Sequence, residues 1–268
     1  METKREKAKN FIIIGTVLII FSICVIQLND NIIPTAVEAK NNKTIGWGIK
    51  RAENNMQPDV GTANKKLLED NGGICLGSEL EKVIYLTFDE GYEAGYTSKI
   101  LDTLKENEIK ATFFITAHYL NTAPELIQRM IDEGHIIGNH TVNHPSMPSI
   151  SDEQIETEIM QLHQALYEKF NYEMKYIRPP KGEFNERTLK KTTELGYKTV
   201  MWSFAYVDWD EKNQPSIEKS KETIINNFHC GEIMLLHPNS KTNAEVLDTI
   251  IKEAKSQGYE FKSLDEFK

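Results

Sequence analysis

The sequence is poor in cysteine and has a deficit of cations. Its 268 residues include three cysteines, and one of them, Cys24, lies inside an apolar run. Cys75 and Cys230 then leave room for at most one disulfide, which excludes a small fold stabilised by several disulfides. Lys and Arg number 31 against 40 Asp and Glu, for a net charge of −9. Because binding nucleic acid requires clustered cations, a nucleic-acid partner is excluded, and a neutral or weakly charged polymer is favoured.

Charge is also missing from one stretch near the N-terminus. Residues 11–27 contain no charged residue and follow several cations, including Lys7 and Lys9. This pattern predicts a cytoplasmic tip and a hydrophobic anchor or signal segment over residues 1–27, with the rest of the chain exported. A cleavable signal with Val37 and Ala39 at its cleavage site stays open. We therefore expect an extracytoplasmic protein that contacts the membrane through this segment or is secreted.

Residues 28–80 show little periodicity and predict a linker and an N-terminal extension that packs on the following domain. Residues 81–268 alternate short apolar runs with helix-length stretches, which predicts one α/β domain with a parallel sheet, either open or closed as a barrel. Ser151, with Gln154 three residues later, predicts the start of one helix. The seven expected strands are 83–88, 111–116, 135–138, 174–177, 199–202, 233–236 and 259–261.

Polar residues capable of chemistry follow the carboxyl ends of the expected strands. In a parallel barrel these ends share one face, so side chains far apart in sequence are expected to meet in one cleft. The residues concerned are Asp89, Glu90, His140, His144, Arg178, Asp208, Trp209 and His237.

Two imidazoles and a carboxylate in this set predict a metal site. His140 and His144 lie in one loop, and Glu90 would supply an oxygen ligand from a neighbouring strand end. Such an ion polarises a carbonyl and activates water, as the hydrolysis of an amide at neutral pH requires. A turn after the strand would explain Glu90 equally well.

The remaining residues predict proton transfer. Asp89 would take a proton from the attacking water, with Arg178 holding its carboxylate through a two-pronged contact. His237 would protonate the leaving amine, and Asp208 would stabilise its imidazolium form. Each has a structural alternative, because a single histidine at a strand end is often a hydrogen-bonded structural residue and an arginine can belong to the surface.

The motifs resemble those of the polysaccharide deacetylase family, the NodB-type carbohydrate esterases, over residues 82–268. They are Thr-Phe-Asp-Glu-Gly at 87–91, His-Thr-Val-Asn-His-Pro at 140–145, Arg-Pro-Pro-Lys-Gly at 178–182, Asp-Trp at 208–209 and Leu-Leu-His at 235–237. The resemblance implies a distorted (β/α)7 barrel and a divalent metal, usually zinc, on His140 and His144. It also implies that Asp89 is the general base and His237 the general acid. Glu90, where the family usually has Asp, and Ala205, where many members are acidic, depart from the pattern.

Within the family, the motifs and the upstream segments at 46–48 and 57–61 look most like the subgroup that deacetylates N-acetylmuramic acid on the route to the muramic δ-lactam of spore cortex. This implies peptidoglycan glycan strands as the partner. A deacetylase of N-acetylglucosamine, chitin or acetyl-xylan, and an inactive wall-binding protein, stay open, as does the oligomeric state. The residues expected to contact substrate are Tyr92, Lys181, Gly182, Trp209 and Leu235.

Overall fold

Parallel strands form one curled sheet at the centre of the protein. The computed structural model describes residues 42–268, so the expected segment at residues 1–27 lies outside the described part. None of the helices within residues 42–268 is long and apolar enough to cross a membrane. The sheet has seven strands in the order β7-β5-β4-β3-β2-β8, with β9 also paired to β2. Their bounds are β2 (Val83–Glu90), β3 (Thr112–Ile115), β4 (Ile136–Asn139), β5 (Tyr176–Ile177), β7 (Lys198–Thr199), β8 (Glu232–Leu236) and β9 (Glu260–Phe261).

All of these strand pairs are parallel, so the predicted α/β class is confirmed. The sheet curls as a partial barrel. Beyond β7 the chain continues to Phe204, which forms a parallel bridge with Met234 of β8. This irregular segment links the two sides of the curl, where a closed barrel would have a regular strand.

Strand β2 is buried along its whole length, as expected for a parallel strand covered on both faces. Its side chains alternate between two apolar clusters. Ile84, Leu86 and Phe88 face the helices, whereas Val83 and Tyr85 face the inside of the curl. The residues that follow, Asp89 and Glu90, continue this alternation because they still belong to the strand.

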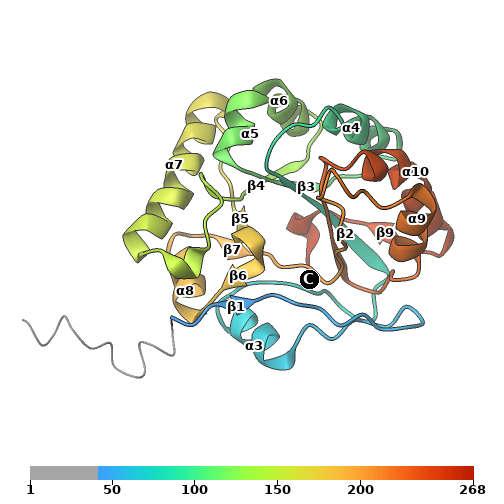
Figure 1. Ribbon diagram of the computed structural model, residues 1–268, viewed down its shortest axis with the longest axis horizontal. Coiled ribbons are helices and arrows are strands. Elements are labelled where there is room, and N and C mark those ends of the chain that lie inside the picture. The colour runs from blue at the N-terminus through green and yellow to red at the C-terminus, as the bar shows by residue number, and fades with distance from the viewer. Residues whose placement is uncertain (1–41) are drawn as a thin grey trace, which may run out of the picture. The chain divides into compact units, whose positions relative to one another are not determined.

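Helices cover the outer face of the sheet in an arc (Figure 1). The helix that begins after Ser151 has the predicted capping box, because the Ser151 and Gln154 side chains each bond the other's backbone N–H. A short helix, α5, follows β3 where none was expected. The helices are α4 (Thr97–Glu106), α5 (Ala117–Thr122), α6 (Pro124–Asp132), α7 (Asp152–Phe170), α8 (Glu186–Glu194), α9 (Ile217–Ile225) and α10 (Lys241–Ser256).

The segment before β2 runs along the side that the helical arc leaves uncovered (Figure 1). It contains β1 (Ile45–Gly46), which pairs antiparallel with β6 (Glu183–Phe184), and helix α3 (Thr62–Asp70). An apolar cluster joins it to the rest of the fold. Its buried members are Trp47, Val60, Leu68, Cys75, Phe184, Leu189 and Met201.

Candidate active site

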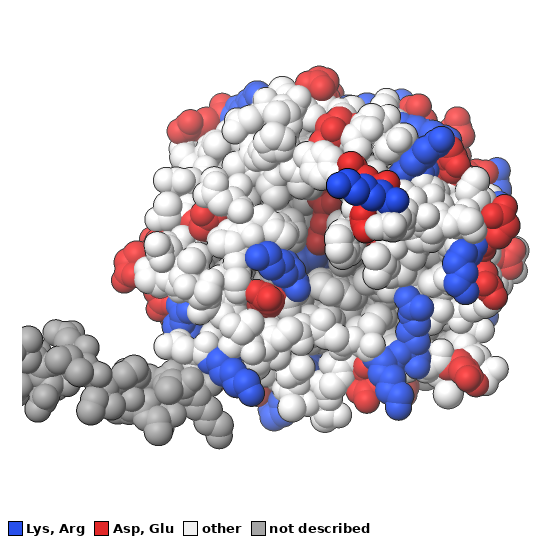
Figure 2. All heavy atoms as spheres, in the orientation of Figure 1, with Lys and Arg blue, Asp and Glu red and all other residues white. Residues whose placement is uncertain are grey.

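The carboxyl ends of the strands surround a cavity of about 540 Å³. Figure 2 shows a hollow near the centre of this face, with acidic atoms visible inside it and mostly uncharged side chains around it. The convergence expected for a parallel sheet is therefore present, and residues from five separate loops meet there. The lining residues are Asp89, Gly91, Tyr92, His144, Lys181, Trp209, His237 and Asn239.

Asp89 forms a buried ion pair with Arg178 at the base of the cavity. The Arg178 Nη1 group donates to Asp89 Oδ1 at 2.8 Å, while Nε donates to the Val200 carbonyl at 3.1 Å. The contact is therefore single rather than the expected two-pronged one. The guanidinium also lies over the Phe114 ring, with 4.3 Å to the ring centre. Burial alone would raise the pKa of Asp89, but the charges of Arg178 and His140 hold it below its ordinary value. Asp89 is thus kept ionised and able to accept a proton.

His140 and His144 lie edge to face, with ring centres 4.8 Å apart. His140 Nδ1 is 2.8 Å from the Arg178 carbonyl oxygen, which can only accept, so Nδ1 carries the proton and Nε2 keeps its lone pair. His140 Nε2 is 3.6 Å from Asp89 Oδ2. Burial lowers the pKa of both histidines, that of His144 to about 4, so both rings are neutral at pH 7. Neutral imidazoles are the form that binds metal.

The loop carrying these histidines has strained backbone. Thr141 and His144 adopt φ values of 68° and 56°, a region that β-branched residues such as threonine rarely occupy. Three contacts hold the loop: Asn139 Oδ1 accepts from the Thr141 N–H, Thr141 Oγ1 accepts from the His144 N–H, and the Glu158 carboxylate accepts two bonds from Asn143. The surrounding structure therefore imposes the histidine geometry, as is common where strain is stored at functional sites.

Glu90 does not join the histidines, which corrects the expected three-ligand metal set. It lies on the helix-facing side of β2, because adjacent strand residues point to opposite faces and Asp89 occupies the inner one. Its side chain is 1% exposed, and Thr97 of α4 donates to its Oε1 at 3.2 Å. Burial raises the pKa of Glu90 well above the ordinary value, which favours the neutral acid.

The residues present fit part of the metal site that the family resemblance implies. The two neutral imidazoles of His140 and His144 lie next to each other. The hydrogen bond from His140 Nδ1 to the Arg178 carbonyl fixes that ring and leaves Nε2 available, as is typical of metal-binding histidines. Within residues 42–268, no group of three or more His, Cys, Asp or Glu side chains is arranged to hold a metal ion. The histidine pair is thus the part of the expected ligand set that the fold supplies.

This placement predicts how variants change metal binding. Glu90→Gln is expected to leave the dissociation constant for zinc unchanged, because the side chain faces α4 and the substitution keeps its shape. His140→Ala is expected to weaken zinc binding at least 10-fold through the loss of one of two imidazoles. Calorimetric titration of the metal-free protein with zinc measures both. Equal weakening in the two variants would contradict the assigned orientation of Glu90.

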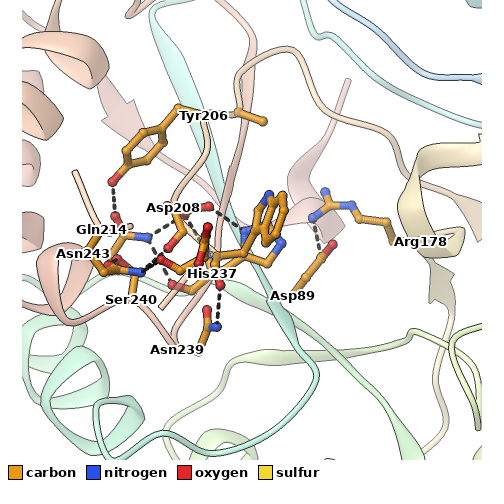
Figure 3. A network of polar contacts seen from close by, with 12 residues as sticks. Asp89, Arg178, Tyr206, Asp208, Gln214, His237, Asn239, Ser240 and Asn243 are labelled. Atoms are coloured by element: carbon orange, nitrogen blue, oxygen red, sulfur yellow. Dashed lines mark hydrogen bonds and ion pairs between the residues drawn. The ribbon is translucent and has the colours of Figure 1, made fainter. Parts of the chain in front are cut away.

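His237 lies on the other side of the cavity in a buried hydrogen-bond network centred on Asp208 (Figure 3). His237 Nδ1 donates to Asp208 Oδ1 at 2.8 Å, and the His237 backbone N–H donates to Oδ2 at 2.8 Å. Asn243 Nδ2 also donates to Oδ2, at 2.6 Å. Burial works against a charged imidazole, but the Asp208 carboxylate outweighs it and raises the pKa of His237. His237 is thereby prepared to donate a proton into the cavity.

The rim of the cavity carries aromatic and amide groups. Tyr92 and Trp209, both exposed, line it, and Asn239 Nδ2 donates to the Tyr92 hydroxyl at 2.9 Å and to the Trp209 carbonyl at 3.1 Å. Two residues expected at the substrate lie elsewhere. Gly182 is buried against Trp202, and Leu235 is 4% exposed and outside the lining.

Asn239 and Asn243 were not among the expected site residues. Both follow His237 closely, one in the same loop and one in the first turn of α10. Their nearness in sequence to a strand-end histidine was the available signal, but an Asn at the start of a helix usually indicates only a cap.

A carboxylate with a lowered pKa and an imidazole with a raised pKa line one cavity on a curled parallel sheet, and together they define a hydrolase site. Comparison with known proteins agrees. Residues 77–200 match the polysaccharide deacetylase family, and the chain belongs to this family. It is 46% identical over 230 residues to the peptidoglycan-N-acetylmuramic acid deacetylase PdaA of Bacillus subtilis. The matched region covers 85% of this chain and 88% of that protein.

Two further similarities bear on the site. The structure of Bacillus subtilis PdaA, a family 4 carbohydrate esterase, superposes with a TM-score of 0.82 at 45% identity, covering 84% of this chain and 97% of the other. A peptidoglycan-N-acetylglucosamine deacetylase of Bacillus cereus is 36% identical over 189 residues, covering 69% of this chain and 88% of that protein.

Proposed function

We propose that this protein hydrolyses the N-acetyl group of N-acetylmuramic acid in peptidoglycan. The observation that carries the proposal is the position of Asp89 and His237 in the lining of one cavity, where the pKa of Asp89 is lowered and the pKa of His237 is raised. The similarity to PdaA, which extends over 85% of the chain, supports muramic acid as the sugar. Aromatic rings at the rim, Tyr92 and Trp209, offer flat faces on which a pyranose can stack.

In this mechanism Asp89 removes a proton from a water molecule, and the oxygen attacks the carbonyl carbon of the acetamide. Arg178 keeps the carboxylate oriented and ionised throughout. His237 then gives its Nε2 proton to the amide nitrogen, the C–N bond breaks, and acetate and a free amine leave. Asp208 stabilises the imidazolium before the transfer. Its hydrogen bond to Nδ1 keeps the Nδ1 proton on the ring, so the proton that leaves is the one on Nε2.

We further propose that a divalent ion, zinc by the preference of imidazole ligands, is held by His140 and His144. When bound, the ion supplies positive charge that polarises the acetamide carbonyl. The protein's part is to keep both rings neutral and in place through the Arg178 carbonyl and the contacts of the strained loop.

The biological setting is part of the same proposal. The uncharged run at residues 11–27 supports an extracytoplasmic enzyme that is anchored in the membrane or secreted. The product amine lies on the same sugar as the lactyl carboxyl, and closure between the two forms a lactam. We therefore place the enzyme on the route to the muramic δ-lactam of spore cortex.

The test is to incubate the protein with peptide-free glycan strands and with chitin oligomers, and to follow acetate release by mass spectrometry. Loss of one acetyl group from each muramic residue, with chitin oligomers a poor substrate, is the expected result. Preferential deacetylation of chitin would assign the enzyme to N-acetylglucosamine. An absence of acetate from both substrates would refute the hydrolase proposal.

The two shifted pKa values predict the pH dependence of kcat/KM. Asp89 acts when deprotonated, so its lowered pKa places the acid limb below the ordinary value of 3.8. His237 acts when protonated, so its raised pKa places the alkaline limb above 6.5. Asp208→Asn removes the charge that raises the pKa of His237 and is expected to move the alkaline limb to lower pH. If the alkaline limb does not move in this variant, His237 is not the group whose titration causes it.

A further inference from the structure

Lys181 is the one lysine or arginine among the residues that line the cavity. Within residues 42–268 its ammonium group makes no hydrogen bond or ion pair, in contrast to Lys190 and Lys191 on the following helix, which pair with Glu186 and Glu156. The only acidic residue of the lining, Asp89, is already paired with Arg178. Among the described residues, the positive charge at the cavity therefore forms no ion pair with the protein.

The backbone at Lys181 is held in an unfavourable conformation. Its φ and ψ are 60° and 6°, in the left-handed region that residues other than glycine rarely occupy. Pro179 and Pro180 restrict the chain before it. Gly182, at φ 65°, packs so closely under Trp202 that an added Cβ would lie 2.6 Å from the ring. Such conformations persist only where the surroundings impose them, and they concentrate at ligand-binding positions.

Part of this restraint comes from Trp47 in the N-terminal segment. The Trp47 backbone N–H donates to the Gly182 carbonyl at 2.8 Å, and its indole Nε1 donates to the Trp202 carbonyl at 2.8 Å. Strand β1 also pairs with the two residues after Gly182. Trp47 lies N-terminal to residues 77–200, which match the family model, so the Lys181 loop is supported from outside that matched region.

The geometry points to Lys181 as a specificity-determining residue that binds a carboxylate on the sugar, with Trp47 as the residue that positions it. In the proposed substrate this group is the lactyl carboxylate of N-acetylmuramic acid, which N-acetylglucosamine lacks. The inference rests on the proposed function and deepens it, because it names the group by which one amino sugar is distinguished from the other. Lys181 lines the same cavity as Asp89 and His237, which places its ammonium group beside the acetamide site.

The experiment compares peptide-free glycan strands whose lactyl carboxylates are free with the same strands converted to methyl esters. The wild-type protein is expected to favour the free acid by roughly 10-fold to 100-fold in kcat/KM, the ratio for a hydrogen bond between charged groups. Lys181→Met is expected to reduce this ratio to about 1, mainly through KM, and Lys181→Arg to retain most of it. Lys252→Met, on the exposed face of α10, is the matched control and should keep the wild-type ratio.

The outcomes separate the inference from the proposed function. A wild-type protein that releases no acetate from either form would refute the function itself. An active wild-type protein whose preference for the free acid survives in Lys181→Met would overturn the inference and leave the function standing.

Trp47 is tested in the same assay. Trp47→Phe removes the Nε1 hydrogen bond to Trp202 but keeps an aromatic ring in the apolar cluster. A positioning role predicts a lower ratio between free acid and ester. A folded variant in which both rates fall equally, with the ratio unchanged, would show a merely structural role and remove Trp47 from the inference.

Discussion

Asp89→Asn is expected to lower kcat/KM for acetate release by roughly 10³-fold or more, the upper part of the range for a positioned general base. The asparagine side chain has nearly the same shape but cannot take a proton from water. Substrate binding should change little, because in the proposed mechanism the carboxylate acts on water and is held by Arg178, so the loss should appear in kcat. Steady-state kinetics on peptide-free glycan strands measures it.

This substitution also affects the fold, and the control must account for that. Arg178 is completely buried, and removing the partner of a buried charge costs about 3–5 kcal/mol when nothing replaces it. Asparagine Oδ1 can still accept from Nη1, so a smaller cost is expected. Urea unfolding followed by circular dichroism shows whether the variant is folded in the assay. Asp248→Asn, on the exposed surface of α10, is the matched control. A folded Asp89→Asn enzyme with wild-type turnover would remove the base assignment.

His237→Ala is expected to lower kcat about 100-fold or more, the usual effect of losing a positioned general acid. The amine would then have to leave without a proton from the protein. Exogenous imidazole should restore part of the rate, because the deleted ring leaves space beside the cavity and Asp208 stays in place to orient a replacement. A plot of rate against imidazole concentration tests this directly.

The control for this variant is His163→Ala, which deletes an imidazole on α7 that bonds the Tyr197 hydroxyl outside the cavity. It should retain wild-type turnover. If His237→Ala loses activity and imidazole gives no recovery while the fold is intact, His237 would be a structural partner of Asp208 rather than an acid.

The arrangement of the sheet followed from periodicity, because short apolar β-branched runs alternating with long amphipathic stretches have few other solutions. All seven expected strands exist, and each lies within a few residues of its predicted place. The segment before β2 was harder to predict. Helix α3 and strand β1 depend on contacts with Phe184 and Met201, which are more than 100 residues away. The local sequence gives no signal for contacts over such a separation.

The convergence of the strand ends was predictable for the same topological reason, but the direction of one side chain was not. The expected first strand ended at Phe88, which would have left Asp89 and Glu90 in a loop free to point the same way. In the structure β2 extends through Glu90, so the pleat sends the two carboxylates to opposite faces. Two residues of extra strand thus decide whether Glu90 can be a ligand. The Asn243 contact to Asp208 was similarly hidden, since it depends on where α10 begins.

The apolar cluster that includes Trp47 determines how far the N-terminus can be shortened before the fold is exposed. A shortened protein beginning at Gly77, where the family match starts, would leave the outer faces of Phe184, Leu189 and Met201 open to water. It would also lose the β1 partner of the β6 edge, whose unpaired backbone groups invite association with another chain. Expression trimmed to the family boundary should therefore give aggregates, whereas trimming to Thr44 keeps this surface covered.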